Sequence, residues 1–257
     1  MKKELRIFLT AIMFLTRLPV PRSTDHSADY LRQAPRYFPL VGWIVGGCCT
    51  LTFWLFNKYF TGSIVVVASM ITGLLVTGCF HEDGFADVCD GMGGGWTKDK
   101  ILLIMKDSRI GAYGAIGLVM ILLTKFLLLE QLYLLFVPAL IVAHSISRLM
   151  PVLVMKGGVY AADPDQSKAR PLAGPGLSRE TLAVAILLAL PPLLLSPFIF
   201  HPWCLFVILV PPLLITWLMY RWFFKWIGGY TGDCLGAIQQ VTEIVIYLGI
   251  IFLSRYL

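Results

Sequence analysis

Residues 62–91 read GSIVVVASMITGLLVTGCFHEDGFADVCDG and join an uncharged apolar run to a dense acidic segment. The run 62–80 is about as long as the roughly 20 helical residues that cross the hydrocarbon core of a bilayer. Its continuous apolar character favours a transmembrane helix over the alternating strands of a membrane β-barrel. We therefore predict an all-α membrane chain that places ionisable groups directly at the end of a span.

The whole chain has the composition of a polytopic membrane protein. Of its 257 residues, 58% are hydrophobic and only 14% are charged, which leaves too little polar surface for a soluble globule. Apolar runs predict spans at 37–57, 62–80, 111–129, 132–155, 180–199, 203–226 and 240–257. We expect a transmembrane helix bundle of about seven spans, within a range of six to eight, because proline or glycine pairs interrupt the last three. Residues 1–257 then form one integral membrane domain.

The N-terminal residues 3–18 predict an amphipathic helix that lies in the membrane interface. Lys3, Arg6 and Arg17 fall on one face of this helix and apolar residues fall on the other. The basic start resembles a signal peptide, but no small-residue cleavage site follows it. We expect this segment to be retained.

Lysine and arginine gather in the N-terminal segment and in the stretches 81–110, 156–179 and 221–239. The positive-inside rule places all of these segments in the cytoplasm. Catalytic loops are expected near 81–110, 156–179 and 227–239, so the active site should open on that side. Because the basic residues are spread over separate loops, we expect no nucleic-acid partner.

The acidic segment places Asp83, Asp87 and Asp90 at positions i, i+4 and i+7, which share one face of a helix. Three carboxylates on one face repel one another unless a cation lies among them. Mg²⁺ prefers carboxylate and water oxygens and is often shared with substrate phosphates. Glu82 points away from this face and is a poorer ligand. The sequence predicts a Mg²⁺ site for a diphosphate, and the alternative is a solvated acidic helix end.

Basic residues follow the acidic segment in IMKDSRIG, residues 104–111. Lys106 and Arg109 suit phosphate oxygens, although charges that only set the topology are an alternative. The polar stretch 163–171 contains Lys168 and Arg170, which we expect to cover the nucleotide or the phosphates of the substrate.

Two of the charged residues that lie inside apolar runs stand out, because a charge there is costly unless it faces a polar cavity or a partner. Arg148 is one, and snorkelling of its side chain to the interface is the alternative. Glu243 is the other, and it shares a helix face with Asp233 and Gln240 by spacing. We expect that face to enter the last span.

Four motifs occur in order along the chain: FLTRLP at 14–19, HxDGxADxxDG at 81–91, IMKDSRxG at 104–111 and GxTGDxLGA at 229–237. Together they resemble the cobalamin synthase family, the adenosylcobinamide-GDP ribazoletransferases, over essentially the whole chain. The resemblance implies an enzyme of the prokaryotic cytoplasmic membrane that joins adenosylcobinamide-GDP to α-ribazole or its 5′-phosphate and releases GMP. It also implies a requirement for Mg²⁺ as cofactor.

The resemblance assigns roles to residues of this chain. Catalytic roles fall to Asp83, Asp87, Asp90, Lys106 and Arg109, and the three aspartates are also the expected metal ligands. Arg17, Thr231 and Asp233 lie in these motifs and are expected to bind substrate. The same role is expected for Arg148, Arg170 and Glu243, which the charge pattern singles out and not the motifs. His81 or an aspartate of the cluster is the candidate base. Membrane lipid is an expected partner, together with a second copy of the chain or other cobalamin-assembly enzymes.

Two other functions compete with this one. A CDP-alcohol phosphatidyltransferase also places aspartates on membrane helices, but its pattern expects Asp-Gly-x-x-Ala-Arg, whereas Asp87 follows Ala86 directly here. A transporter would carry polar residues towards both faces of the membrane, whereas the carboxylates here cluster on one side. The sequence favours the ribazoletransferase.

Overall fold

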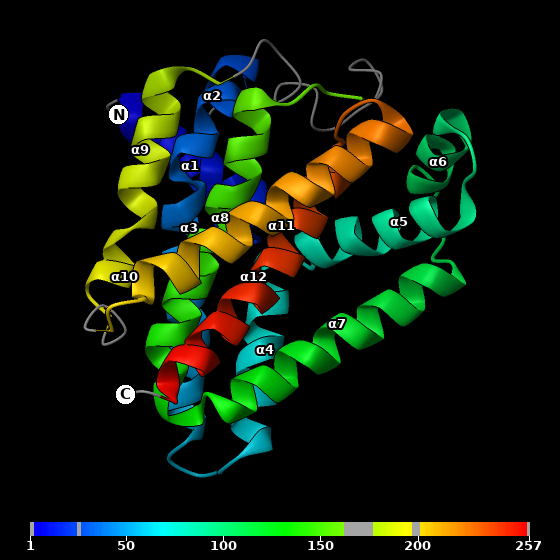
Figure 1. Ribbon diagram of the computed structural model, residues 1–257. Helices are drawn as coiled ribbons and strands as arrows, with labels where there is room; N and C mark the ends of the chain where they lie inside the picture. Colours follow the sequence, from blue (N-terminus) through cyan, green and yellow to red (C-terminus); the bar gives the residue numbers. More distant parts are fainter. Residues whose placement is uncertain (1–2, 25–26, 162–176, 197–200, 256–257) are drawn as a thin grey trace.

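The computed structural model describes residues 3–24, 27–161, 177–196 and 201–255 (Figure 1). All regular elements in these ranges are helical, and one isolated bridge pairs Tyr160 with Tyr230. The all-α prediction is confirmed. The elements are α1 (Lys3–Leu15), α2 (Ala28–Gln33), η1 (Ala34–Tyr37), α3 (Phe38–Phe56), α4 (Ser63–Thr77), α5 (Phe80–Gly94), α6 (Lys98–Met105), α7 (Ala112–Gln131), η2 (Tyr133–Leu135), α8 (Phe136–Gly157), α9 (Arg179–Ala189), α10 (Pro191–Leu194), α11 (Cys204–Ile227) and α12 (Gly232–Ser254).

Five helical segments of the described chain are long and apolar enough to cross a membrane: 28–56, α7, 133–157, α11 and α12. The bent pair of α4 and α5 adds a sixth if it is counted as one span, and six lies within the expected range. The run expected at 180–199 is described as two short helices, α9 and α10, which are separated before Pro191. Proline ends a helix because it lacks an amide hydrogen and its ring clashes with the preceding turn.

Helix α8 forms the centre of the bundle. In the segment 133–157, which contains α8, 78% of the most apolar 18-residue stretch is buried, whereas the corresponding share in α11 is 22%. Helix α3 packs along one side of α8 and α12 packs along another, while α11 and α7 lie at the outside (Figure 1). The apolar surface of α11 therefore faces outward, as expected for a helix in contact with lipid.

The chain turns sharply between α4 and α5, which meet at 87°. Gly78 and Cys79 both have left-handed backbone conformations, with φ of 64° and 57°. The amide of Cys79 donates to the Leu74 carbonyl oxygen at 3.0 Å, which closes the end of α4. The acidic segment is thus a separate helix lying across the bundle (Figure 1), and the stretch expected as a loop at 81–110 contains α5 and α6.

Two other boundaries differ from the expected ones. Helix α12 begins at Gly232 rather than at residue 240, because the Thr231 hydroxyl oxygen accepts from the Cys234 amide at 3.3 Å. Most of the loop expected at 227–239 is therefore helical. The N-terminal helix α1 ends at Leu15, ahead of the predicted limit at 18.

Candidate active site

Helix α5 presents its three aspartates away from the interior. Asp83 is exposed and Asp87 and Asp90 are partly buried, whereas Gly84, Ala86, Val88 and Gly91 on the same helix are buried. The predicted helical face of carboxylates is present. We call Asp83, Asp87 and Asp90, together with Asp233 of α12, the acidic face.

Asp233 joins this face because α5 and α12 approach very closely. A Cβ atom added to Gly84 would lie 2.9 Å from the Cα atom of Asp233. A Cβ atom added to Gly236 would lie 3.1 Å from the His81 carbonyl oxygen. Asp233 therefore lies near enough to Asp83 and Asp87 for the carboxylates to repel one another. The structure therefore confirms Asp233 as a neighbour of the predicted cluster.

The change Gly84→Ala is expected to destabilise the protein by about 1–3 kcal/mol, because the new methyl group meets backbone that cannot move aside. The matched control is Gly47→Ala in α3, where an added Cβ would meet no atom within 4 Å. That variant should be neutral or gain up to about 1 kcal/mol from helix propensity. Thermal unfolding in detergent measures both, and equal unfolding temperatures for Gly84→Ala and wild type would contradict the close approach.

Asp90 has a structural role that its spacing does not reveal. Its carboxylate accepts from the amides of Gly111 at 2.7 Å and Gly114 at 2.8 Å. A Cβ atom on Gly114 would lie 2.3 Å from an Asp90 oxygen, so this position needs glycine. Asp90 thus caps the start of α7 and ties it to α5.

The basic segment between α6 and α7 lies beside this junction. Arg109 is exposed and its guanidinium donates to the Asp107 carboxylate at 2.7 and 3.0 Å. This hydrogen bond lowers the pKa of Asp107 to about 2, so the pair is charged at neutral pH. Lys106 directly follows α6 on the same segment. Both basic residues stand at the C-terminal end of α5, where Asp90 anchors the chain.

The donor atoms of the acidic face are all carboxylate oxygens. No group of three or more His, Cys, Asp or Glu side chains within the described residues is arranged to hold a metal ion by itself. Mg²⁺ commonly takes only one or two carboxylates and fills its other positions with water and substrate phosphates. The carboxylate oxygens therefore fit a Mg²⁺ ion that also binds the oxygens of a diphosphate. They do not form a metal site made of protein ligands alone.

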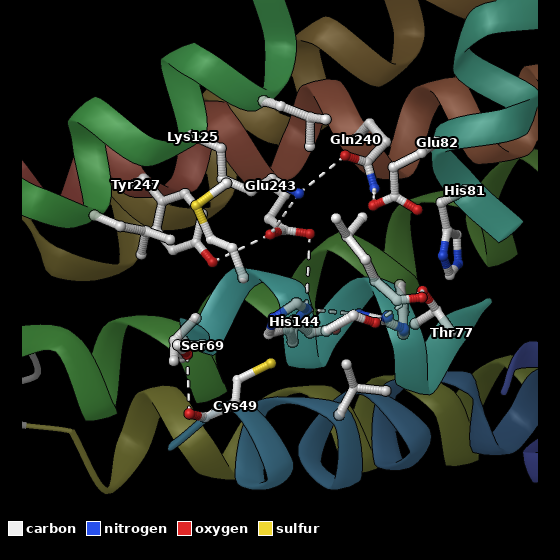
Figure 2. A pocket seen from close by; sticks show the side chains of 18 residues that line it. Cys49, Ser69, Thr77, His81, Glu82, Lys125, His144, Gln240, Glu243 and Tyr247 are labelled. Carbon is white, nitrogen blue, oxygen red and sulfur yellow. Dashed lines mark hydrogen bonds and ion pairs between the residues drawn. The ribbon is translucent and has the colours of Figure 1, made fainter. Parts of the chain in front are cut away.

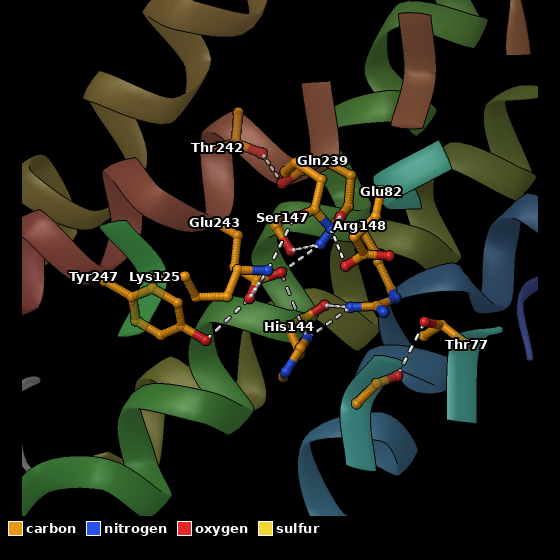
Figure 3. A network of polar contacts seen from close by, with 12 residues as sticks. Thr77, Glu82, Lys125, His144, Ser147, Arg148, Gln239, Thr242, Glu243 and Tyr247 are labelled. Atoms are coloured by element: carbon orange, nitrogen blue, oxygen red, sulfur yellow. Dashed lines mark hydrogen bonds and ion pairs between the residues drawn. The ribbon is translucent and has the colours of Figure 1, made fainter. Parts of the chain in front are cut away.

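Glu243 lies inside the bundle and not on the acidic face (Figure 3). Its carboxylate is 3.1 Å from the Lys125 ammonium and 3.7 Å from Nδ1 of His144. It also accepts from Gln239 at 2.7 Å and from the Tyr247 hydroxyl at 3.1 Å. Glu243 is thus the centre of a buried polar network that joins α7, α8 and α12.

The network continues to α5 through Gln240. The Lys125 ammonium donates to Gln240 Oε1 at 2.9 Å, and Gln240 Nε2 donates to Glu82 Oε1 at 2.9 Å. Glu82 is 8% exposed, so it points into the bundle, as the sequence predicted when it placed Glu82 off the acidic face.

Arg148 lines a cavity, and so do Glu82, Lys125 and Glu243 of this network. Figure 2 shows these last three side chains at the cavity. Arg148 is only 2% exposed, and its Nη1 lies 3.0 Å from His144 Nδ1 and donates to the His144 carbonyl oxygen at 3.0 Å. Snorkelling to the interface does not occur. His81 also lines the cavity and is 5% exposed, so its side chain lies away from the exposed Asp83.

The remaining predicted substrate residues lie in different places. Arg17 is exposed and covers the α4–α5 bend, where a Cβ atom on Gly78 would lie 2.5 Å from Arg17 Nε. Thr231 caps α12 and its hydroxyl donates to Asp233 at 3.3 Å, next to the acidic face. Arg170 lies outside the described residues.

Sequence reasoning did not single out Lys125 or His144. A signal was available, because both occur within long apolar runs, where ionisable residues are rare and have a function or a partner. Both lie close to Glu243 of another helix, α12, so this role becomes visible only in the folded chain.

Residues 7–251 match the model of a family described as cobalamin-5-phosphate synthase. Curated relatives carry the name adenosylcobinamide-GDP ribazoletransferase. One from Vibrio cholerae is 43% identical over 251 residues, which covers 96% of this chain and 94% of the relative. One from Shewanella woodyi is 43% identical over 257 residues, which covers 96% of each chain. No solved structure matches.

Proposed function

The chain belongs to the cobalamin-5-phosphate synthase family, and from this premise we propose that it is an adenosylcobinamide-GDP ribazoletransferase. It joins adenosylcobinamide-GDP to α-ribazole, or to α-ribazole 5′-phosphate, and releases GMP. The observation that carries the proposal is the acidic face, on which Asp233 of α12 stands beside Asp83 and Asp87 of α5. A diphosphate is the substrate group that a shared metal ion would bring to such a face.

The reaction needs one phosphorus–oxygen bond to form and one to break. A ribazole hydroxyl oxygen attacks the phosphorus on the cobinamide side, the bond to the GMP oxygen breaks, and the hydroxyl proton passes to a base. Asp83 is exposed on the acidic face, whereas His81 faces the buried cavity. We therefore place the proton on an aspartate of this face in preference to His81.

The basic segment supports the leaving group. Arg109 can exchange the Asp107 carboxylate for phosphate oxygens, which its planar guanidinium binds in the same two-pronged way. Lys106 stands three residues earlier on the same segment. Positive charge held in place here stabilises the charge that develops on the departing GMP.

We propose Mg²⁺ as the cofactor, held by Asp83 and Asp87, with Asp90 and Asp233 completing the negative surroundings. Bound Mg²⁺ would neutralise the diphosphate and orient it. The protein contributes the placement, because α5 is fixed to α12 by the contact at Gly84 and to α7 by Asp90.

The purified protein is expected to release GMP from adenosylcobinamide-GDP only when α-ribazole and Mg²⁺ are both present. EDTA should abolish this release and added Mg²⁺ should restore it. Chromatography of the nucleotide and corrinoid products measures the reaction. Reaction without α-ribazole is the control for simple hydrolysis, and CDP-diacylglycerol with an alcohol tests the phosphatidyltransferase alternative. Absence of GMP release under the full conditions would refute the proposed function.

We also propose that the acidic face opens to the cytoplasm. Lysines and arginines gather in the N-terminal segment and in the stretches 81–110, 156–179 and 221–239, and the first of these stretches contains Asp83, Asp87 and Asp90. The same assay tests this orientation. Sealed inside-out membrane vesicles should release GMP, and sealed right-side-out vesicles should not, because the charged substrates do not cross the bilayer. The reverse result would place the face on the other side.

A further inference from the structure

Two residues that line the cavity beside Arg148, one of them Arg148 itself, each carry a buried polar atom that has no hydrogen-bond partner among the described residues. These atoms are Oε2 of Glu82 and Nε of Arg148, and both side chains are more than nine-tenths buried. Both residues line the cavity, and Figure 3 shows the two side chains. An unpaired buried polar atom is costly, and the cost is larger for a charged group. These two atoms therefore require a ligand that the protein itself does not supply.

The size and charge of the cavity identify that ligand. Its volume of about 30 Å³ admits about two water molecules, since one needs roughly 10–15 Å³ by this measure. The charges around it balance, because Glu82 and Glu243 are matched by Lys125 and Arg148. A metal cation would leave an excess positive charge in a buried site. Water has no such cost and both donates and accepts hydrogen bonds.

We propose that this cavity binds ordered water, through which Glu82 of α5 and Arg148 of α8 form an ion pair. Glu82 lies in the first turn of α5 and also accepts a hydrogen bond from Gln240 of α12. Arg148 is fixed on α8 by His144 (Figure 3). The water-mediated pair holds the first turn of α5, from which Asp83 projects. Glu82 is thus a positioning residue, and this last step rests on the proposed function.

A double-mutant cycle on Glu82→Gln and Arg148→Met tests the ion pair. Each single variant leaves the other charge buried without its partner, and should lower the unfolding temperature by about 10 °C. The double variant should unfold nearer to wild type than either single variant does. Glu180→Gln and Arg179→Met, two exposed residues at the start of α9, are the matched controls and should change it little. Additive losses in the double variant would overturn the proposal.

A crystallographic map at a resolution that shows water tests the ligand itself. Density should lie about 2.8–3.0 Å from Glu82 Oε2 and from Arg148 Nε. An empty cavity, or coordination distances of about 2.3–2.5 Å that identify a cation, would overturn the assignment of water.

The positioning role is tested by the Mg²⁺ dependence of GMP release. In Glu82→Gln the Mg²⁺ concentration for half-maximal activity should rise severalfold, while the KM for α-ribazole stays unchanged. Parallel changes in both would indicate general damage and overturn the positioning role. If wild type releases no GMP, the proposed function fails, but the unfolding cycle still decides the ion pair.

Discussion

The substitution Asp83→Asn should lower GMP release by about 10³-fold or more. The amide keeps the size of the side chain but removes one negative charge and one of the oxygens that we propose bind Mg²⁺. A metal ion supplies several kcal/mol of charge stabilisation in such reactions, and about 4 kcal/mol corresponds to a factor of about 10³ in rate. Asp87→Asn should have a similar effect. Steady-state GMP release at saturating Mg²⁺ measures both variants.

The control for these variants is Asp99→Asn, which makes the same chemical change at an exposed position of α6. Its activity should remain close to wild type. Unfolding temperatures must stay near the wild-type value in Asp83→Asn and Asp87→Asn, because exposed or partly buried carboxylates that repel one another do not stabilise the fold. Near-normal turnover in both variants would refute the roles assigned to the acidic face.

Lys125→Met should destabilise the protein by about 3–5 kcal/mol. Methionine preserves most of the packing of the lysine stem but leaves Glu243 buried without its cationic partner, and breaking one side of a buried ion pair carries this cost. Both side chains are almost fully buried, at 9% and 1% exposure for Lys125 and Glu243. Thermal or chemical unfolding of the protein in detergent micelles measures the loss.

Lys58→Met is the matched control, since Lys58 is exposed and its ammonium lies 3.7 Å from the centroid of the Trp54 ring. It should cost less than about 1 kcal/mol. Combining Lys125→Met with Glu243→Gln should cost less than the sum of the two single changes, because the second removes the charge that the first leaves unpaired. Strict additivity would show that the two residues do not interact in the folded protein.

The sequence by itself determined the class of fold and the helical arrangement of the three α5 aspartates in the acidic face. Apolar runs such as 62–80 predict membrane helices because a bilayer requires every backbone polar group to be satisfied within the segment. The spacing of Asp83, Asp87 and Asp90 predicts one helical face because neighbours three and four residues apart always meet on a helix. Both are local properties, and the structure shows both segments as helices, although α4 (Ser63–Thr77) ends before residue 80 and reaches the length of a span only together with α5.

Only the tertiary structure decided how residues distant in sequence meet. Asp233 lies on the acidic face because α5 and α12 meet closely at Gly84, and Glu243 lies in a buried network with Lys125. The tertiary structure also turned α5 across the bundle at Gly78 and Cys79, so that Glu82 enters the cavity while its neighbour Asp83 faces out. The physical reason is that pairing and burial depend on packing between helices, and the pattern along one helix does not specify which face of which neighbour it will meet.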